Sequence, residues 1–308
     1  MLEYHAALLS DEVRTNAFLA ALKQRVRPGS RVLDVGTGTG ILALAAERLG
    51  ADVVAVEAGD MIDYARAVAR KNGSNVRFIH DDIRKLDPSA IEPVDTIVCE
   101  MIGNMLLDEK IISVMESARR FLKQEGIVIP SAVQLRVALV NSVPVAKAAA
   151  FWREKRYGFD FSALAECMEH YTFPDYLKPS MLLGPGSSLP EIDLMTATGD
   201  RFSGSCTLVA DRSGECNAVL AWWSARLSPG VVLEEKPDEA WSGQHWFRTL
   251  FPVDSMPVSP GDAFPFSIEH DAAVPRGMWT WTLGSRRRST FFQFPQTRER
   301  LMRVFGAD

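Results

Sequence analysis

The first 126 residues alternate short apolar runs with longer segments of helical periodicity, and this alternation leaves few possible folds. Each apolar run predicts a buried strand, and each periodic segment predicts an amphipathic helix. Strands that alternate with helices form a parallel, doubly wound sheet. The predicted strands are 31–36, 52–59, 76–82 and 94–100, and the predicted helices are 41–50, 61–73 and 111–126.

The pattern changes after Pro130. Short apolar segments such as AVQLRVALV and NAVLAWWSARL follow, with proline and glycine between them, and these predict an antiparallel barrel or sandwich. Residues 147–182 are the exception, because their pattern is helical and amphipathic. A chain of 308 residues is long for a single core, so two domains with a boundary near residue 130 are expected.

Composition excludes several classes of protein. A net charge of -5 argues against a general nucleic-acid binder, which needs a basic face. The dense basic run SRRRS at 285–289 is expected to be a solvated turn or strand end. The longest apolar runs are far shorter than the roughly eighteen residues that cross a bilayer, so no membrane partner is expected.

The cysteines and the N-terminus indicate a reduced, cytoplasmic setting. The first fifteen residues carry three acids, which is unlike a signal peptide. The four cysteines have neither CxxC nor metal-ligand spacing, so no disulfide framework and no metal site are predicted.

A glycine-rich turn follows the first predicted strand, in LDVGTGTG. Gly36, Gly38 and Gly40 permit the positive φ values and the close backbone approach that a bound ligand requires. The third glycine comes one residue earlier than in the turn of dinucleotide binders, and Asp34 precedes the turn. The pattern therefore suits a ligand without phosphates.

Acidic side chains also end the next two strands. Glu57 is placed to hold both hydroxyls of a ribose, and Asp82 is placed to receive an adenine amino group. Three acids at successive strand ends resemble the class I S-adenosylmethionine-dependent methyltransferases, which implies a Rossmann-like domain. The positions that this resemblance adds to the cofactor site are Thr37, Ala58 and Ile83.

The stretch CEMIGNMLLDEK (99–110) places Glu100 at the tip of a buried strand and Glu109 nine residues later. This stretch resembles the double-glutamate loop of the protein arginine N-methyltransferase family, which implies a guanidinium acceptor, a permanent cation whose planar donors match carboxylates. Two glutamates would offset both this cation and a cationic methyl donor, and the apolar residues between them would exclude water. Glu109 alone also fits a helix N-terminus, whereas Glu100 at a buried strand tip needs a partner.

Three further segments match the family in order: HAALLSDEVRT (5–15), WREKRYGFDFSAL (152–164) and QHWFRTLF (244–251). By this resemblance, Arg14 binds the cofactor carboxylate and Glu100 lies beside both cofactor and acceptor.

The same resemblance assigns the remaining catalytic roles. Glu100 and Glu109 orient the acceptor guanidinium, and His245 paired with Asp11 relays a proton. The residues expected to complete the acceptor site are Met101 and Trp246.

The resemblance implies a Rossmann-like methyltransferase domain with an N-terminal helix over 1–130, followed by a β-barrel domain over 131–308. A helical dimerisation arm is expected at about 160–182. The implied cofactor is S-adenosyl-L-methionine, with S-adenosyl-L-homocysteine as product, and the implied assembly is a ring-shaped homodimer. The arm residues expected to dock on a partner are Phe161, Leu164, Tyr171, Phe173, Tyr176 and Leu177.

The chain also departs from the family pattern. Four residues precede His5, so the tyrosine-bearing helix that covers the cofactor is expected to be largely missing, with weaker closure or a different lid. Met101 stands where the family has tryptophan, and Gln244 replaces a threonine. Leu8 and Ile111 stand where dimethylating members carry methionines, so the number of methyl groups added is not indicated.

Three functions stay open at this stage. The first is methylation of arginine in a protein or peptide, of free arginine, or of a small guanidine, and an acidic chain suits such cations. The alternative is a small-molecule methyltransferase with a non-guanidine acceptor. The third is a non-catalytic scaffold, which the intact glycine turn and both glutamates disfavour.

Overall fold

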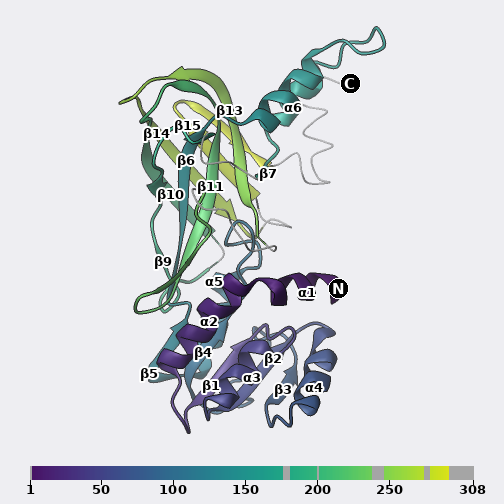
Figure 1. Cartoon of the computed structure of the whole chain (residues 1–308), viewed down its shortest axis with the longest axis vertical. Helices are drawn as coiled ribbons and strands as arrows, with labels where there is room; N and C mark the ends of the chain where they lie inside the picture. The colour runs from purple at the N-terminus through teal and green to yellow at the C-terminus, as the bar shows by residue number, and fades with distance from the viewer. Residues whose placement is uncertain (1, 176–180, 200, 238–245, 274–277, 291–308) are drawn as a thin grey trace.

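The computed structural model describes residues 2–175, 181–199, 201–237, 246–273 and 278–290 (Figure 1). A five-stranded parallel sheet with the order β3-β2-β1-β4-β5 occupies one end of the molecule, and two antiparallel sheets occupy the other. The strands of the parallel sheet are β1 (Arg31–Val35), β2 (Asp52–Glu57), β3 (Arg77–His80), β4 (Val94–Cys99) and β5 (Leu122–Ile129). The helices of this half are α1 (Leu2–Ser10), α2 (Glu12–Arg25), α3 (Ile41–Arg48), α4 (Met61–Lys71) and α5 (Ile111–Ala118).

The central strands β1 and β4 are apolar and buried, as expected for a parallel sheet whose two faces are covered by helices. Val32 and Leu33 of β1 are fully buried, as are Ile97 and Val98 of β4. The strand order reverses at β1, between β2 and β4. Parallel sheets bind ligands at the carboxyl ends of the strands beside such a reversal, so the fold itself points to the turn after β1.

The predicted helix 111–126 is wrong in its second half. Helix α5 ends at Ala118, a 3₁₀ turn covers Arg119–Phe121, and β5 begins at Leu122. Strand β5 pairs with β4, and its Ile127, Val128 and Ile129 align with residues 96–98. These β-branched residues give β4 a second parallel neighbour, and this pairing outweighs the helical character of the polar residues before them.

The second half is a β-barrel domain built from a seven-stranded and a four-stranded antiparallel sheet. Large aromatic side chains, including Trp223, Phe251 and Trp281, are fully buried in its interior. The longer strands are β6 (Ala132–Val140), β10 (Arg201–Val209), β11 (Gly214–Ser228), β13 (Arg248–Val258), β14 (Ala263–Asp271) and β15 (Met278–Leu283). The shorter strands are β7 (Phe173–Asp175), β8 (Ser187–Ser188), β9 (Ile192–Asp193), β12 (Val231–Glu234) and β16 (Arg286–Ser289).

A helical arm leaves the barrel after β6 and returns at β7 (Figure 1). It contains α6 (Val143–Arg153), a tight turn at 156–159, and α7 (Ala163–Met168). The helical pattern read over 147–182 is therefore correct for two short helices, whereas 173–175 forms a strand, and residues 176–180 lie outside the described part. Tyr157 at the tip of the arm is 97% exposed.

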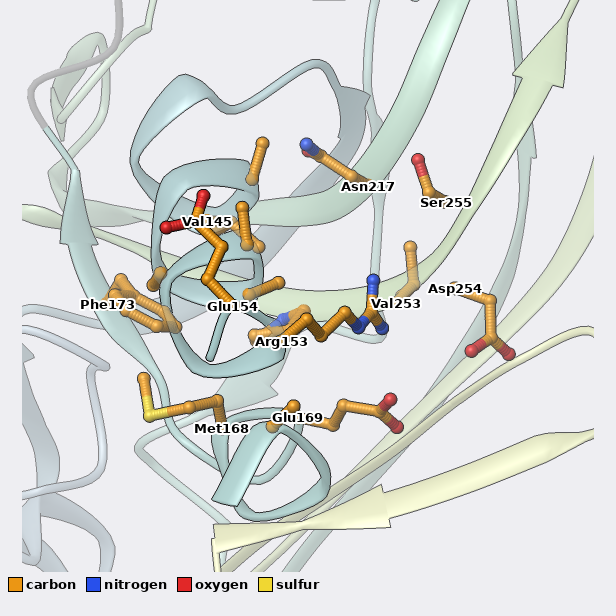
Figure 2. Close-up of a pocket in the computed structure, with 16 residues that line it drawn as sticks. Val145, Arg153, Glu154, Met168, Glu169, Phe173, Asn217, Val253, Asp254 and Ser255 are labelled. Carbon is orange, nitrogen blue, oxygen red and sulfur yellow. The ribbon is translucent and has the colours of Figure 1, made fainter. Parts of the chain in front are cut away.

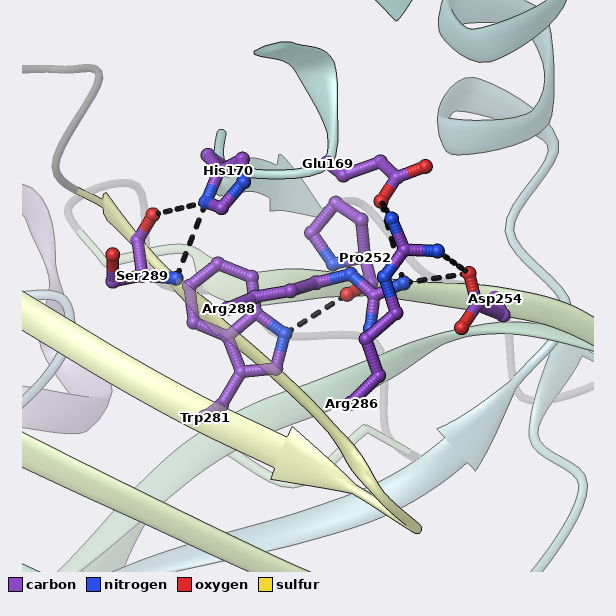
Figure 3. Close-up of polar contacts among 8 residues, drawn as sticks. All are labelled: Glu169, His170, Pro252, Asp254, Trp281, Arg286, Arg288 and Ser289. Carbon is purple, nitrogen blue, oxygen red and sulfur yellow. Dashed lines mark hydrogen bonds and ion pairs between the residues drawn. The ribbon is translucent and has the colours of Figure 1, made fainter. Parts of the chain in front are cut away.

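The basic run at 285–289 is not simply solvated, as the sequence had suggested. Arg288 of β16 is 3% exposed, and its guanidinium bonds Asp254 at 2.7 Å. Arg286 bonds the same Asp254 at 2.7 Å and Glu169 at 2.6 Å, so two arginines and two carboxylates form one cluster (Figure 3). Because Glu169 follows α7, this cluster ties the base of the arm to β13 and β16.

None of the described helices is long and apolar enough to cross a membrane.

Candidate active site

The glycine-rich turn lies at the carboxyl end of β1 and is bound to the end of β2. The backbone N–H groups of Gly36 and Thr37 donate to Val56 O at 2.9 and 3.1 Å. The N–H of Gly38 donates to a carboxylate oxygen of Glu57 at 2.9 Å. Gly36 and Gly38 have φ values of +71° and +55°, which side chains rarely adopt. The turn therefore presents its backbone next to the Glu57 carboxylate.

Asp34 of β1 fixes the shape of this turn through two hydrogen bonds. Its carboxylate is buried and accepts hydrogen bonds from Thr37 Oγ1 at 2.6 Å and from Ala43 N at 3.0 Å. The two bonds join the turn to the first residues of α3. Burial raises the pKa of Asp34 to about 7, although both hydrogen bonds act in the opposite direction.

Glu100 follows β4 and forms an ion pair with Arg14 of α2. The other terminal nitrogen of Arg14 donates to Leu8 O of α1 at 3.1 Å, so this arginine joins the first helix to the strand tip. Burial raises the pKa of Glu100, and the Arg14 charge counteracts that rise. The partner that a carboxylate at a buried strand tip requires is thus Arg14.

Glu109 lies at the far end of the same loop, and its side chain lines the same cavity as Glu100. Burial raises the pKa of Glu109 to about 7, with the negative charge of Glu100 as the second cause. The carboxylates of Glu100 and Glu109 therefore lie near one another, and Arg14 is the one cation beside them among the described residues.

Asp11 begins α2 and is fully buried. One carboxylate oxygen accepts from Arg14 N at 3.0 Å, and the other has no hydrogen-bond partner among the described residues. The Trp246 ring lies 6.0 Å from the Arg14 guanidinium, and its Nε1–H donates to Ile102 O at 2.7 Å. His245 and Gln244 lie outside the described residues.

A cavity of about 180 Å³ lies between the glycine turn, the glutamate loop and α1. Ligand pockets typically measure about 300–1,000 Å³, so this cavity is small for a ligand of cofactor size. The predicted site residues that line the cavity are Arg14, Asp34, Gly36, Thr37, Gly38, Glu57, Glu100, Met101 and Glu109.

The remaining predicted residues lie outside this lining. Asp82 follows β3, and its carboxylate is bonded to the Arg84 guanidinium at 2.6 Å. Ile83 is buried, whereas Ala58 is exposed. Gly40 begins α3 with a φ of +85°. Contacts of these residues with an adenosyl group stay a prediction, and an adenine amino group would compete with Arg84 for Asp82.

Two family models match consecutive parts of the chain. The model of ribosomal protein L11 methyltransferase matches residues 13–138, and the model of the arginine methyltransferase oligomerization subdomain matches residues 132–276. An arginine N(omega)-methyltransferase of Streptomyces achromogenes subsp. streptozoticus is 32% identical over 275 residues, which are 86% of this chain and 75% of the relative. The chain belongs to the protein arginine N-methyltransferase family.

Further relatives and solved structures agree with this family and with its fold. Protein arginine N-methyltransferase 6 of Xenopus tropicalis is 31% identical over 81% of this chain and 78% of its own. The Trypanosoma brucei PRMT1 enzyme–prozyme complex with AdoHcy superposes with a TM-score of 0.85 at 21% identity, covering 92% of this chain and 97% of the other. Arabidopsis thaliana protein arginine methyltransferase 10 superposes at 0.79 with 25% identity, covering 94% and 97%.

Several residues that line the cavity of this methyltransferase were missed in the sequence. Tyr4, His5 and Leu9 all come from α1. A carbon added at Gly38 would lie 3.2 Å from the His5 ring, so α1 lies directly over the glycine turn. The available signal was the helical spacing of Tyr4 and His5 with Leu8 and Leu9, one turn apart on the helix.

A larger cavity of about 440 Å³ lies between the arm and the barrel (Figure 2). The cavity exists because the alanines of α6 and Ala165 of α7 have small side chains. Charged side chains such as Arg153 and Glu169 lie at its edge. It shares no lining residue with the cavity at the glycine turn. None of the described residues predicted for the cofactor or the acceptor lines this larger cavity.

The described residues contain no group of three or more His, Cys, Asp or Glu side chains placed to hold a metal ion.

Proposed function

We propose that this chain transfers a methyl group from S-adenosyl-L-methionine to a terminal nitrogen of an arginine guanidinium group, releasing S-adenosyl-L-homocysteine. One observation carries the proposal: Glu100 and Glu109 line the same small cavity as the glycine turn. Membership of the arginine methyltransferase family supports the choice of acceptor.

The residues around the turn fit the cofactor. Glycines at 36 and 38 leave room for close approach, since a side-chain carbon at Gly36 would lie 2.9 Å from Met101. Glu57 ends β2, where a carboxylate can accept from both ribose hydroxyls. Arg14 carries the positive charge that a methionine carboxylate requires. When bound, the cofactor supplies an electrophilic methyl group on a cationic sulfur.

The two glutamates would bind and orient the acceptor. A guanidinium in the cavity supplies the positive charge that keeps Glu109 ionised, although burial raises the pKa of Glu109 to about 7 in the free protein. A bidentate carboxylate pair fixes the plane of the guanidinium and aims one nitrogen at the methyl carbon. Apolar residues of the loop, such as Ile102, exclude water and so strengthen these charge interactions.

A proton must leave the acceptor nitrogen after transfer. Asp11 is suited to support a proton carrier, because it is buried and one of its oxygens has no partner among the described residues. We propose His245 as that carrier, in keeping with the family resemblance and with its place directly before Trp246.

The acceptor of this enzyme is an arginine side chain in a protein or peptide, free arginine, or another small guanidine. The match to the arginine N(omega)-methyltransferase of Streptomyces achromogenes keeps free arginine alongside peptides. We further propose a homodimer, supported by the oligomerization subdomain match and by exposed apolar side chains on the arm. Phe161, Leu164 and Tyr171 are exposed there, whereas Phe173 packs on the protein's own barrel.

The test is an assay with labelled cofactor and three acceptors: free arginine, arginine-rich peptides, and a pool of amine, hydroxyl and carboxylate metabolites. Products are identified by mass spectrometry. Labelled methyl groups on guanidine nitrogens support the proposal. Labelling of the metabolite pool alone would support a non-guanidine methyltransferase instead, and failure to bind the cofactor in calorimetry would support a scaffold.

The variant Glu100→Gln keeps the shape of the side chain but removes its charge. We expect it to lower kcat at least about 100-fold, as losses of electrostatic stabilisation commonly do, while cofactor affinity changes only a few fold. Glu92→Gln is the matched control, because Glu92 is an exposed glutamate paired with Arg31 on the surface. Normal turnover by Glu100→Gln would contradict the proposed role.

A further inference from the structure

An arginine in the 3₁₀ turn between α5 and β5 holds the loop that follows β3. One terminal nitrogen of Arg120 donates to Ile83 O at 3.0 Å and to Leu86 O at 3.2 Å. Its Nε–H donates to Ser117 O at 2.9 Å, and its guanidinium lies 5.6 Å from the ring of the buried Phe121. The side chain is therefore fixed on its own helix while it binds two carbonyl groups of a loop more than thirty residues away.

This loop contains the residues that are predicted to meet the adenine of the cofactor. Asp82 O accepts from Lys85 N at 2.8 Å, so residues 82–85 form a tight turn directly after β3. The side chains of Ile83 and Leu86 are buried. The two carbonyl groups that Arg120 binds thus belong to the turn itself and to the residue that follows it.

We propose that Arg120 is a positioning residue for the cofactor, holding the turn at 82–86 so that Asp82 and the backbone of Ile83 meet the adenine ring. This inference rests on the proposed use of S-adenosyl-L-methionine and on the predicted place of its adenine. Arg120 does not line the cavity at the glycine turn, so it acts through residues 82–86.

The position of β3 explains why the turn needs such support. Strand β3 lies at one edge of the parallel sheet and pairs, among the described strands, with β2 alone. Backbone that has to be ordered when a ligand binds lowers the affinity for that ligand. Arg120 lies directly before β5, the strand at the other edge, and so fixes the turn from a second part of the domain.

The test is Arg120→Met, which keeps the length of the side chain but deletes its donors. Calorimetry measures Kd for S-adenosylhomocysteine and for S-inosylhomocysteine, in which a carbonyl oxygen replaces the adenine amino group. We expect Kd for S-adenosylhomocysteine to rise about fivefold, the effect of losing hydrogen bonds from a charged group whose side chain is exposed. Kd for S-inosylhomocysteine should change less, because it lacks the amino group that Asp82 is predicted to accept. In the methylation assay, KM for the cofactor should rise while kcat at saturating cofactor stays within about twofold, as expected for a residue that acts on binding alone.

Arg119→Met is the matched control on the neighbouring residue. Arg119 also donates to two carbonyl groups of a loop, Leu194 O at 2.7 Å and Ala197 O at 2.8 Å. That loop belongs to the barrel domain and does not line the cavity at the glycine turn. Arg119→Met should therefore match wild type in both dissociation constants, even if it lowers the free energy of unfolding as much as Arg120→Met does.

A second variant, Arg120→Lys, keeps the charge but loses the planar fork, and its Kd for S-adenosylhomocysteine should lie between those of wild type and Arg120→Met. It provides the same comparison of the two ligands if Arg120→Met fails to fold. The positioning role is overturned if the Arg120 variants bind S-adenosylhomocysteine as wild type does, if they weaken both ligands equally, or if Arg119→Met has the same effect. Wild-type enzyme that binds S-adenosylhomocysteine but methylates no guanidine contradicts the proposed acceptor and leaves the role of Arg120 intact.

Discussion

At the scale of single residues, Gly38 shows how backbone and ligand requirements meet at one position. Its φ of +55° is in the left-handed region, its N–H donates to Glu57, and a side-chain carbon there would lie 3.2 Å from the His5 ring. Glycine thus serves both the turn geometry and the close approach of α1.

Gly38→Ala should weaken cofactor binding about tenfold, the equivalent of about 1.4 kcal/mol, because the added methyl group displaces His5 from the cover of the site. Calorimetric titration with S-adenosylhomocysteine measures the change. Gly73→Ala is the control for backbone strain alone, since Gly73 has a φ of +65° and no neighbour within 4 Å of the added carbon. Both variants should lose about 1 kcal/mol of unfolding free energy, and equal cofactor affinities would contradict this account.

Residue spacing along the chain predicted the acids at the strand ends, because the carboxyl edge of a parallel sheet gathers whatever follows each strand. Contacts between distant segments could not be predicted in this way. Tyr4 and Glu109 line one cavity although more than a hundred residues separate them, and Arg288 is paired with Asp254 on another strand. In the sequence, Tyr4 is an ordinary tyrosine and Arg288 is part of an ordinary basic run.

At the scale of elements, tertiary pairing determines whether a segment becomes a helix or a strand when its local sequence pattern is ambiguous. The segment 122–129 begins with polar residues of helical character and ends with β-branched ones, and its pairing with β4 makes it a strand. In the arm, a side-chain cap marks the start of α6, whereas α7 begins without one. Helix α6 begins at Ser142, whose hydroxyl accepts from Val145 N at 3.4 Å.

Asn217 of β11 holds the start of α6 with two buried hydrogen bonds. Its side-chain oxygen accepts from Ser142 N at 2.8 Å, and its side-chain nitrogen donates to Ser142 O at 2.9 Å. Asn217→Ala leaves both backbone groups without these partners, so we expect a loss of about 2 kcal/mol in the free energy of unfolding by urea. Asn75→Ala, at an exposed position, should cost less than about 0.5 kcal/mol. Equal losses would mean that Asn217 does not anchor the helix.

At the scale of the whole molecule, the barrel holds the glutamate loop of the other domain in place. Trp246 donates to Ile102 O at 2.7 Å, and Phe247 N donates to Asn104 Oδ1 at 3.0 Å. The Trp246 ring also packs edge to face on the buried Trp223 of β11, with centroids 4.6 Å apart. Buried apolar side chains of both domains form one continuous core. The geometry of the glutamate loop therefore depends on both domains.

The opposite end of the barrel carries the arm through the cluster of Arg286, Arg288, Glu169 and Asp254 (Figure 3). Arg288→Met keeps the length of the side chain but removes its charge, and should cost about 2 kcal/mol of unfolding free energy. That figure is below the cost of a fully buried pair, since the Asp254 side chain is 53% exposed and Arg286 still contacts it.

Arg287→Met provides the matched control on the same strand, because Arg287 faces outward and its side chain is 68% exposed, paired with Glu269. It should change the unfolding free energy by less than about 0.5 kcal/mol. Light scattering at micromolar concentration adds a second readout: a homodimer held by the arm should dissociate at higher concentration in Arg288→Met than in wild type or Arg287→Met. Equal stability of the two variants would contradict the anchoring role, and a monomeric wild type would contradict the homodimer while leaving the stability comparison intact.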